Sequence, residues 1–134
     1  MPAHETTLRV RYGECDMQGI VFNAHYLAWF DVANTELWRD AVGSWAALTE
    51  QGLEAVVAEA RLRFRAPARF DEEVVLRTTV AALGETSMTT TCDVVRDGEL
   101  LVAGELRHVF LDGTTWEKVR IPDWVRSRLE PYSA

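Results

Sequence analysis

The sequence has few of the residues that carry metal and thiol chemistry. Its 134 residues include two cysteines, Cys15 and Cys92, without C-x-x-C spacing, and three histidines, His4, His25 and His108, without metal-ligand spacing. This scarcity excludes a zinc site built on cysteine pairs, and neither a metal nor a redox cofactor is expected. A disulfide is not expected in a cytosolic chain, and Cys92 is interpreted as a small apolar strand residue.

Long apolar runs, excess positive charge and common catalytic signatures are also missing. No stretch is long enough to span a bilayer, and Met1–Thr7 lacks the basic start and apolar core of a signal peptide. A cytoplasmic protein without a membrane partner is therefore expected. The formal net charge of −7 argues against nucleic-acid binding, which needs a basic face. No G-x-S-x-G elbow, Gly-rich phosphate loop or H-E-x-x-H motif occurs.

The composition is that of one ordinary globular domain covering residues 1–134. Hydrophobic residues make up 48% and charged residues 26% of the chain, and no repeat, linker or low-complexity segment is visible. An apolar stripe predicts one long helix from Ala24 to Val42, with Asn23 as its N-cap and Gly43 as its C-terminal stop. The stripe, widened by Leu27, Trp29 and Trp38, consists of Tyr26, Phe30, Ala33, Leu37 and Ala41.

Alternation of apolar and polar residues predicts five strands. The first, Thr6–Tyr12, precedes a loop, Gly13–Gly19, with a turn at Gly19. The other four form a predicted meander: Val57–Arg65, Glu73–Ala82, Ser87–Arg96 and Leu100–Leu111. The second strand shows the clearest alternation, with Ala58, Ala60, Leu62 and Phe64 on one face.

The Asp97–Gly98 pair predicts a tight hairpin, and Pro122 marks the start of a short C-terminal helix with Trp124, Val125 and Leu129 as apolar contacts. This order predicts an α+β fold in which a curved antiparallel sheet buries one face against the long helix. The open edges of the sheet predict self-association, as a homodimer or homotetramer.

The segment Tyr12–Tyr26 is the most suggestive for chemistry. Asp16 lies in a loop, followed by the turn at Gly19 and the start of the long helix. Free N–H groups at a helix N-terminus stabilise a developing oxyanion, and a carboxylate beside them can attack a carbonyl or activate water. On pattern alone, however, a loop aspartate before a helix is more often a turn or cap residue.

A second possibility at this segment is a nucleophilic Cys15 with His25 as its base, although no third orienting group is evident. Asp16 and Cys15 therefore both stay open as candidate nucleophiles from the residues alone.

The same segment resembles the hotdog-fold acyl-CoA thioesterases, specifically the 4-hydroxybenzoyl-CoA thioesterase and YbgC-like group. The residues that carry the resemblance are Tyr12, Asp16, Gly19, Ile20, Val21, Phe22, Asn23 and Tyr26. Leu62–Glu73 is similar to the family's second strand and the turn after it, and Arg107–Phe110 is also similar. The resemblance covers nearly the whole chain and implies a hotdog fold, in which a curved antiparallel sheet of about five strands wraps one long central helix.

The resemblance implies hydrolysis of an acyl-CoA thioester, with Asp16 as nucleophile or general base. It implies that Asn23 supplies a backbone N–H to an oxyanion hole and that Gly19 allows a tight turn beside the substrate carbonyl. Some members carry His at the Asn23 position, so a side-chain base there is excluded in this chain. No cofactor is implied, since coenzyme A is part of the substrate and a thiolate leaves readily at neutral pH.

Substrate-binding candidates by the same resemblance are Tyr26, His25, Glu59, Arg63, Arg65 and Arg69, with Arg107, Lys118 and Arg120 as further cations for the nucleotide. Solvated surface charge is the commoner role for such residues. Trp29, Trp38 and Trp45 are expected in the core or at the floor of the acyl pocket, with the core preferred. The alternatives are a non-catalytic acyl-CoA or acyl-carrier binding module and a thioesterase acting on acyl carrier protein. A hotdog dehydratase or hydratase is disfavoured, because it would need a His with an acidic partner at the site and no such motif is present.

Overall fold

The computed structural model describes residues 3–133. Met1 and Pro2, which belong to the segment where no signal peptide is expected, and Ala134 lie outside it. The elements in chain order are β1 (His4–Arg9), the 3-10 turn η1 (Tyr12–Glu14), α1 (Asn23–Ala41), α2 (Ala46–Thr49), β2 (Leu53–Phe64), β3 (Glu73–Leu83), β4 (Ser87–Arg96), β5 (Glu99–Asp112), α3 (Asp123–Leu129) and the 3-10 turn η2 (Glu130–Tyr132).

The five strands form one antiparallel sheet in the order β1-β3-β4-β5-β2. Five antiparallel strands were predicted, but the four-stranded meander is wrong, because β2 pairs with β5 and not with β3. β3 pairs with β1 on one side and with β4 on the other. β2 pairs with β5, from Leu53↔Asp112 to Phe64↔Val102. β2 therefore forms one edge of the sheet and β1 the other.

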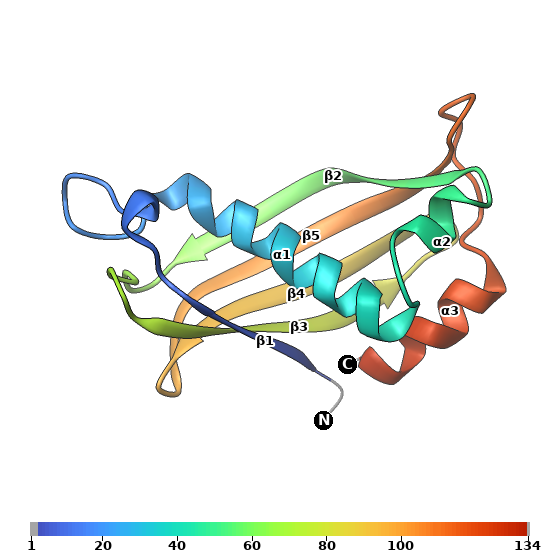
Figure 1. Ribbon diagram of the computed structural model, residues 1–134. Coiled ribbons are helices and arrows are strands. Elements are labelled where there is room, and N and C mark those ends of the chain that lie inside the picture. The colour runs from blue at the N-terminus through green and yellow to red at the C-terminus, as the bar shows by residue number, and fades with distance from the viewer. Residues whose placement is uncertain (1–2, 134) are drawn as a thin grey trace.

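α1 lies along one face of the sheet, with α2 and α3 gathered near its C-terminal end (Figure 1). The predicted stripe faces the sheet, and Phe30 packs so closely on β5 that a Cβ at Gly104 would meet its ring at 2.2 Å. Leu27 is an exception, since it lies on an uncovered flank of α1 and is 44% exposed. One long helix against one antiparallel sheet is the arrangement that the resemblance implies.

The core has two parts along α1. The first surrounds Trp29 and Phe30 and includes residues of β3, β4 and β5. The second surrounds Leu37 and Trp38 and is closed by Leu48 of α2 and by α3. The sequence did not predict α2, because four residues are too few for helical periodicity to stand out.

Several predicted boundaries differ from the structure. The first strand was predicted as Thr6–Tyr12 but ends at Arg9, and Tyr12 begins η1. Asn23 was predicted as the N-cap, but Phe22 has the extended backbone of that position and Asn23 is the first helical residue. A bulge between Val57 and Glu59 removes Ala58 from the inner face of β2.

Other expectations are confirmed. α1 ends at Ala41 and Gly43 follows with φ of 107°, as the C-terminal stop requires. Asp97 and Gly98, both at positive φ, join β4 to β5 in a tight hairpin. α3 begins after Pro122 and buries Val125 and Leu129. Within residues 3–133, none of the helices combines the length and apolar character needed to cross a membrane.

Candidate active site

A small closed loop carries Asp16 from η1 to the start of α1. Its two arms are joined by an isolated bridge between Cys15 and Val21. The Asp16 N–H donates to the Ile20 carbonyl oxygen at 2.9 Å, and the Gly19 N–H donates to the Asp16 carbonyl oxygen at 3.0 Å. Gly19 has φ of 79°, a left-handed conformation that glycine adopts without steric cost, so the predicted turn is confirmed.

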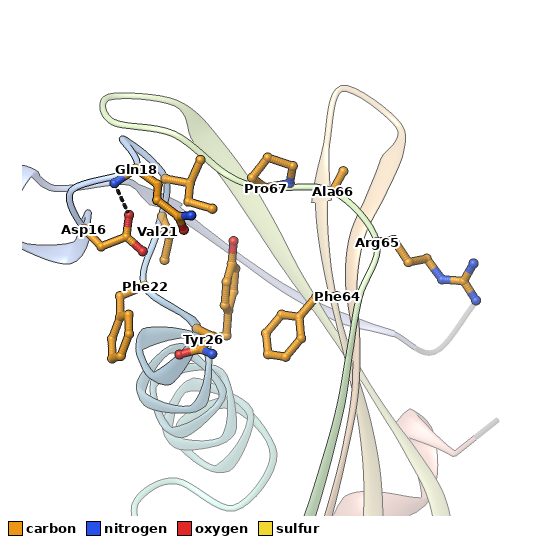
Figure 2. A pocket seen from close by; sticks show the side chains of 11 residues that line it. Asp16, Gln18, Val21, Phe22, Tyr26, Phe64, Arg65, Ala66 and Pro67 are labelled. Atoms are coloured by element: carbon orange, nitrogen blue, oxygen red, sulfur yellow. Dashed lines mark hydrogen bonds between the residues drawn. The ribbon is translucent and has the colours of Figure 1, made fainter.

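The Asp16 carboxylate is fixed on one side only. Its Oδ1 accepts a hydrogen bond of 2.8 Å from the Gln18 N–H, the pattern of an Asx turn (Figure 2). Oδ2 has no hydrogen-bond donor within residues 3–133. One carboxylate oxygen therefore orients the side chain, and the other is free to act on a ligand or a water.

The N-terminus of α1 begins next to this loop. The Phe22 N–H donates to the Glu14 carbonyl oxygen at 2.9 Å, and the His25 N–H donates to the Phe22 carbonyl oxygen at 2.9 Å. The N–H groups of Asn23 and Ala24 have no acceptor in the described part of the chain. Two free donors at the positive end of a 19-residue helix are thus available to a negatively charged oxygen.

The segment after β2 forms the opposite wall. The Val21 N–H donates to the Ala68 carbonyl oxygen at 2.9 Å, and the Ala68 N–H donates to the Tyr26 hydroxyl oxygen at 3.1 Å. Arg96 holds the same segment by donating to the Pro67 carbonyl oxygen at 3.0 Å and to Glu72 at 2.8 Å. The loop of Asp16, the first turn of α1 and this segment are therefore tied into one unit.

Between these walls lies a hollow of about 400 Å³. In Figure 2, Asp16 and Phe64 stand on opposite sides of it, with the ring of Tyr26 between them, and Arg65 points away from the other side chains. The lining residues are Asp16, Gln18, Ile20, Val21, Phe22, Asn23, Tyr26, Phe64, Arg65, Ala66 and Pro67. The hollow is mainly apolar and presents one carboxylate beside a helix N-terminus.

A second hollow, of about 470 Å³, also reaches Asp16. Three exposed apolar side chains line it, Tyr12, Met17 and Phe70, and the rings of Tyr12 and Phe70 meet edge to face at 5.9 Å. Asp16 thus lines both hollows.

Several predicted site residues are brought together here. Asp16, Asn23, Tyr26 and Arg65 line the first hollow, and Gly19 lines the second. Burial raises the pKa of Tyr26 above its ordinary value.

Two further candidates lie beside the hollows. Arg69 adjoins the loop of Asp16 through a bridge to Ile20. The ring of His25 packs edge-on against Phe22 at 6.2 Å. No hydrogen bond joins His25 to Cys15 among the described residues.

Other predicted candidates lie elsewhere. Glu59 is on the outer face of β2, where it pairs with Arg61 at 3.3 Å and with Arg107 at 3.6 Å. Arg63 lines a shallow outer hollow with Thr91 and Asp93.

Two further predicted cations, Lys118 and Arg120, lie in the segment between β5 and α3. Lys118 forms an isolated bridge with Leu111, near the C-terminal end of β5. Phe64, which lines the first hollow, pairs with Val102 near the other end of that strand. Arg120 follows shortly after and pairs with Asp123 at 2.8 Å. Within one chain, neither contributes to the hollows at Asp16.

The sequence analysis missed Phe64 and Glu14. Phe64 was predicted only as a strand residue, although its place just before Pro67 marked it as lying at a strand end. Glu14 is a buried carboxylate that accepts a hydrogen bond from Trp29 at 2.8 Å, and nothing in the spacing of these two residues signals the contact. No group of three or more His, Cys, Asp or Glu side chains within residues 3–133 is arranged to hold a metal ion.

Comparison with known proteins gives consistent matches. Residues 10–129 match the Thioesterase-like superfamily. The acyl-CoA thioester hydrolase YbgC of Escherichia coli is 31% identical over 106 residues, which cover 78% of this chain and 79% of that protein.

Solved structures match over nearly the full length. A hypothetical protein from Thermus thermophilus is 32% identical with a TM-score of 0.88, and the match covers 96% of this chain and 98% of that one. The DHNA-CoA thioesterase from Staphylococcus aureus, 23% identical, has a TM-score of 0.88 over 97% of this chain and 92% of its own. The fold of these proteins is therefore the fold described above.

Proposed function

This chain belongs to the Thioesterase-like superfamily, and from that membership we propose that it hydrolyses acyl-CoA thioesters at Asp16. The observation that supports the site is the meeting of one incompletely bonded carboxylate with two free N–H groups at the start of α1. Those are the two elements that acyl transfer needs, a nucleophile or base and a stabiliser of negative charge.

Asp16 acts on the thioester carbonyl carbon, either directly or through a water. In the direct route, Oδ2 forms a mixed anhydride with the acyl group while the carbon–sulfur bond breaks, and water then hydrolyses the anhydride. In the other route, Oδ2 takes a proton from a water that attacks the same carbon. Both routes release the carboxylic acid and coenzyme A, and a thiolate leaves without strong acid assistance.

The N–H groups of Asn23 and Ala24 stabilise the charge that develops on the carbonyl oxygen. They are fixed before the substrate arrives, because the N–H of Phe22 is bonded to the carbonyl oxygen of Glu14. Pre-oriented donors of this kind need no reorganisation during the reaction, and each contributes about 10²–10³ in rate.

The two hollows suit a substrate with two arms. An acyl-CoA extends in two directions from its thioester, as the acyl group and as the pantetheine chain. The hollows of about 400 and 470 Å³ are both lined by Asp16, so a thioester placed beside Asp16 can direct one arm toward each. Arg65 and Arg69 lie nearby and form no ion pair within residues 3–133, which leaves them available for phosphate groups.

We also propose that the chain self-associates through β2. This strand has a neighbour on one side only, and its inner face exposes Val57 and Phe64. Leu27 on the facing flank of α1 is exposed as well. A second copy paired to this edge would cover these apolar groups and enclose the first hollow, which Phe64 lines.

The experiment is thiol release from a panel of aliphatic and aromatic acyl-CoAs, measured for the native protein and for Asp16→Asn. We expect native turnover of some members and a loss of at least about a hundredfold in kcat for the variant. Equal activity in both proteins would overturn the role of Asp16. If neither protein turns over any thioester while acyl-CoA still binds, the chain is a binding module.

A further inference from the structure

We infer that Glu14 and Trp29 form a positioning pair that holds the loop of Asp16 against α1. This inference rests on the proposed function, because it concerns how the catalytic carboxylate is held. Glu14 lies two residues before Asp16 on the same arm of the loop, and it is only 6% exposed. Neither residue belongs to the two hollows at Asp16.

The Glu14 carboxylate is fully engaged. Its Oε2 accepts a hydrogen bond of 2.8 Å from the Trp29 indole N–H and one of 3.1 Å from the Arg11 guanidinium. Its Oε1 accepts a hydrogen bond of 2.7 Å from the Arg11 backbone N–H. A buried carboxylate is costly unless donors compensate it, so these contacts fix the side chain in one orientation.

These contacts attach the loop to two points of α1. The Glu14 carbonyl oxygen accepts the N–H of Phe22, the residue just before the helix, and its carboxylate reaches Trp29, two turns along. The loop therefore cannot shift along the helix without breaking one of these bonds. The position of Asp16 relative to the free N–H of Asn23 is set in this way.

Position is what the reaction depends on at this site. A displacement of about 1 Å at a reacting group can cost roughly a hundredfold in rate. The pair does not touch either hollow, so its loss should change kcat much more than KM. A role in folding alone would instead leave the kcat of the folded molecules unchanged.

The chain offers a matched control for the test. Trp29 and Trp38 are both on α1 and both buried, but the Trp38 indole N–H has no acceptor among residues 3–133. Trp29→Phe removes a bonded N–H, and Trp38→Phe removes an unbonded one with the same loss of volume. We compare kcat and KM per folded molecule for both variants with one acyl-CoA that the native protein hydrolyses.

We expect Trp29→Phe to lower kcat about tenfold with KM changed less than about threefold, and Trp38→Phe to leave both near native. Glu14→Gln should lower kcat at least as much, because its amide has one acceptor oxygen and cannot accept both the Arg11 backbone N–H and the Trp29 N–H, and because the charge is lost. Glu14→Asp, which keeps the charge, should recover part of the rate. Equal kcat for the two tryptophan variants, or native kcat in Glu14→Gln, would overturn the inference.

The outcome separates this inference from the proposed function. If Asp16→Asn is inactive while Glu14→Gln and Trp29→Phe keep the native kcat, only the positioning role fails. If Asp16→Asn is as active as the native protein, the proposed catalytic role itself fails.

Discussion

α1 meets the rest of the chain differently at its two ends. Around Leu37 and Trp38 it is enclosed by apolar side chains from α2, α3 and the sheet. At Phe22 and Asn23 it meets a polar loop, a hollow and free N–H groups. The enclosed end gains stability from burial, whereas the open end keeps polar groups available that a packed core would have to satisfy.

Two tryptophans of α1, Trp29 and Trp38, show this difference between the open and the enclosed end. The indole N–H of Trp29, in the open half, donates to Glu14. The indole N–H of Trp38, in the enclosed half, has no acceptor in the described chain. Trp38 instead packs against Trp45 at a ring distance of 4.9 Å and Phe110 at 6.1 Å. A hydrogen bond therefore fixes the tryptophan at the open end, whereas apolar packing holds the tryptophan at the enclosed end.

The largest expected effect is a loss of stability at the enclosed end. Phe110 is fully buried, so Phe110→Ala should lower the free energy of unfolding by about 3–5 kcal/mol. Phe22→Ala, the same change at the open end, should cost less than about 0.5 kcal/mol because Phe22 is exposed. Denaturant unfolding at one protein concentration measures both, and equal losses would remove the contrast between the ends.

A smaller effect concerns the charge on Glu14. Burial alone would raise the pKa of Glu14, but the hydrogen bonds from Trp29 and Arg11 outweigh it and lower the pKa below its ordinary value. Glu14 then stabilises the fold fully above its unfolded pKa of about 4.5, and this contribution disappears as the pH falls through its lower folded pKa.

At neutral pH, Glu14→Gln should therefore lower the free energy of unfolding by about 1–3 kcal/mol. The difference between native and variant should narrow below about pH 4.5, which unfolding curves from pH 7 to pH 3 would measure. A difference that stays constant over this range would show that the charge of Glu14 is not what the fold depends on.

The smallest expected effect is at Cys15, the other candidate nucleophile. Cys15→Ser should keep kcat within about threefold of native, because the proposed chemistry does not use the thiol. A large loss of kcat in Cys15→Ser would favour Cys15 over Asp16 as the nucleophile. Cys92 is a useful internal standard, since burial raises the pKa of its thiol to about 12, and a thiol reagent should leave it unmodified in the folded chain.

The sequence predicted the local elements better than their pairing. Periodicity located α1 and five strands, because each depends on near neighbours in the chain. The pairing of β2 with β5 joins residues that are 38 positions apart at Phe64↔Val102 and 59 apart at Leu53↔Asp112, and alternation alone does not predict which strand is the neighbour. The bulge after Val57 likewise depends on the register with β5.

In the candidate site, too, residues close together in sequence were predicted and contacts between distant residues were not. Asp16, Gly19 and Asn23 stand close together in sequence, so one motif was enough to find them. Glu14 lies in the same segment, but its partner Trp29 is fifteen residues away and was expected only in the core or the acyl pocket. Phe64, the last residue of β2, lines the hollow because its ring lies 5.7 Å from that of Tyr26 on α1, a tertiary contact that no short sequence pattern predicts.

The most direct test of the central claim, that the open end of α1 carries the chemistry, is to compare Asn23→Pro with Asn23→Ala. Proline is favoured at the first position of a helix, so the first variant removes one N–H while α1 still forms. We expect Asn23→Pro to lower kcat by about 10²–10³ and Asn23→Ala, which keeps the N–H, to stay near native. Native kcat in a folded Asn23→Pro protein would contradict the claim that this N–H stabilises the developing oxyanion.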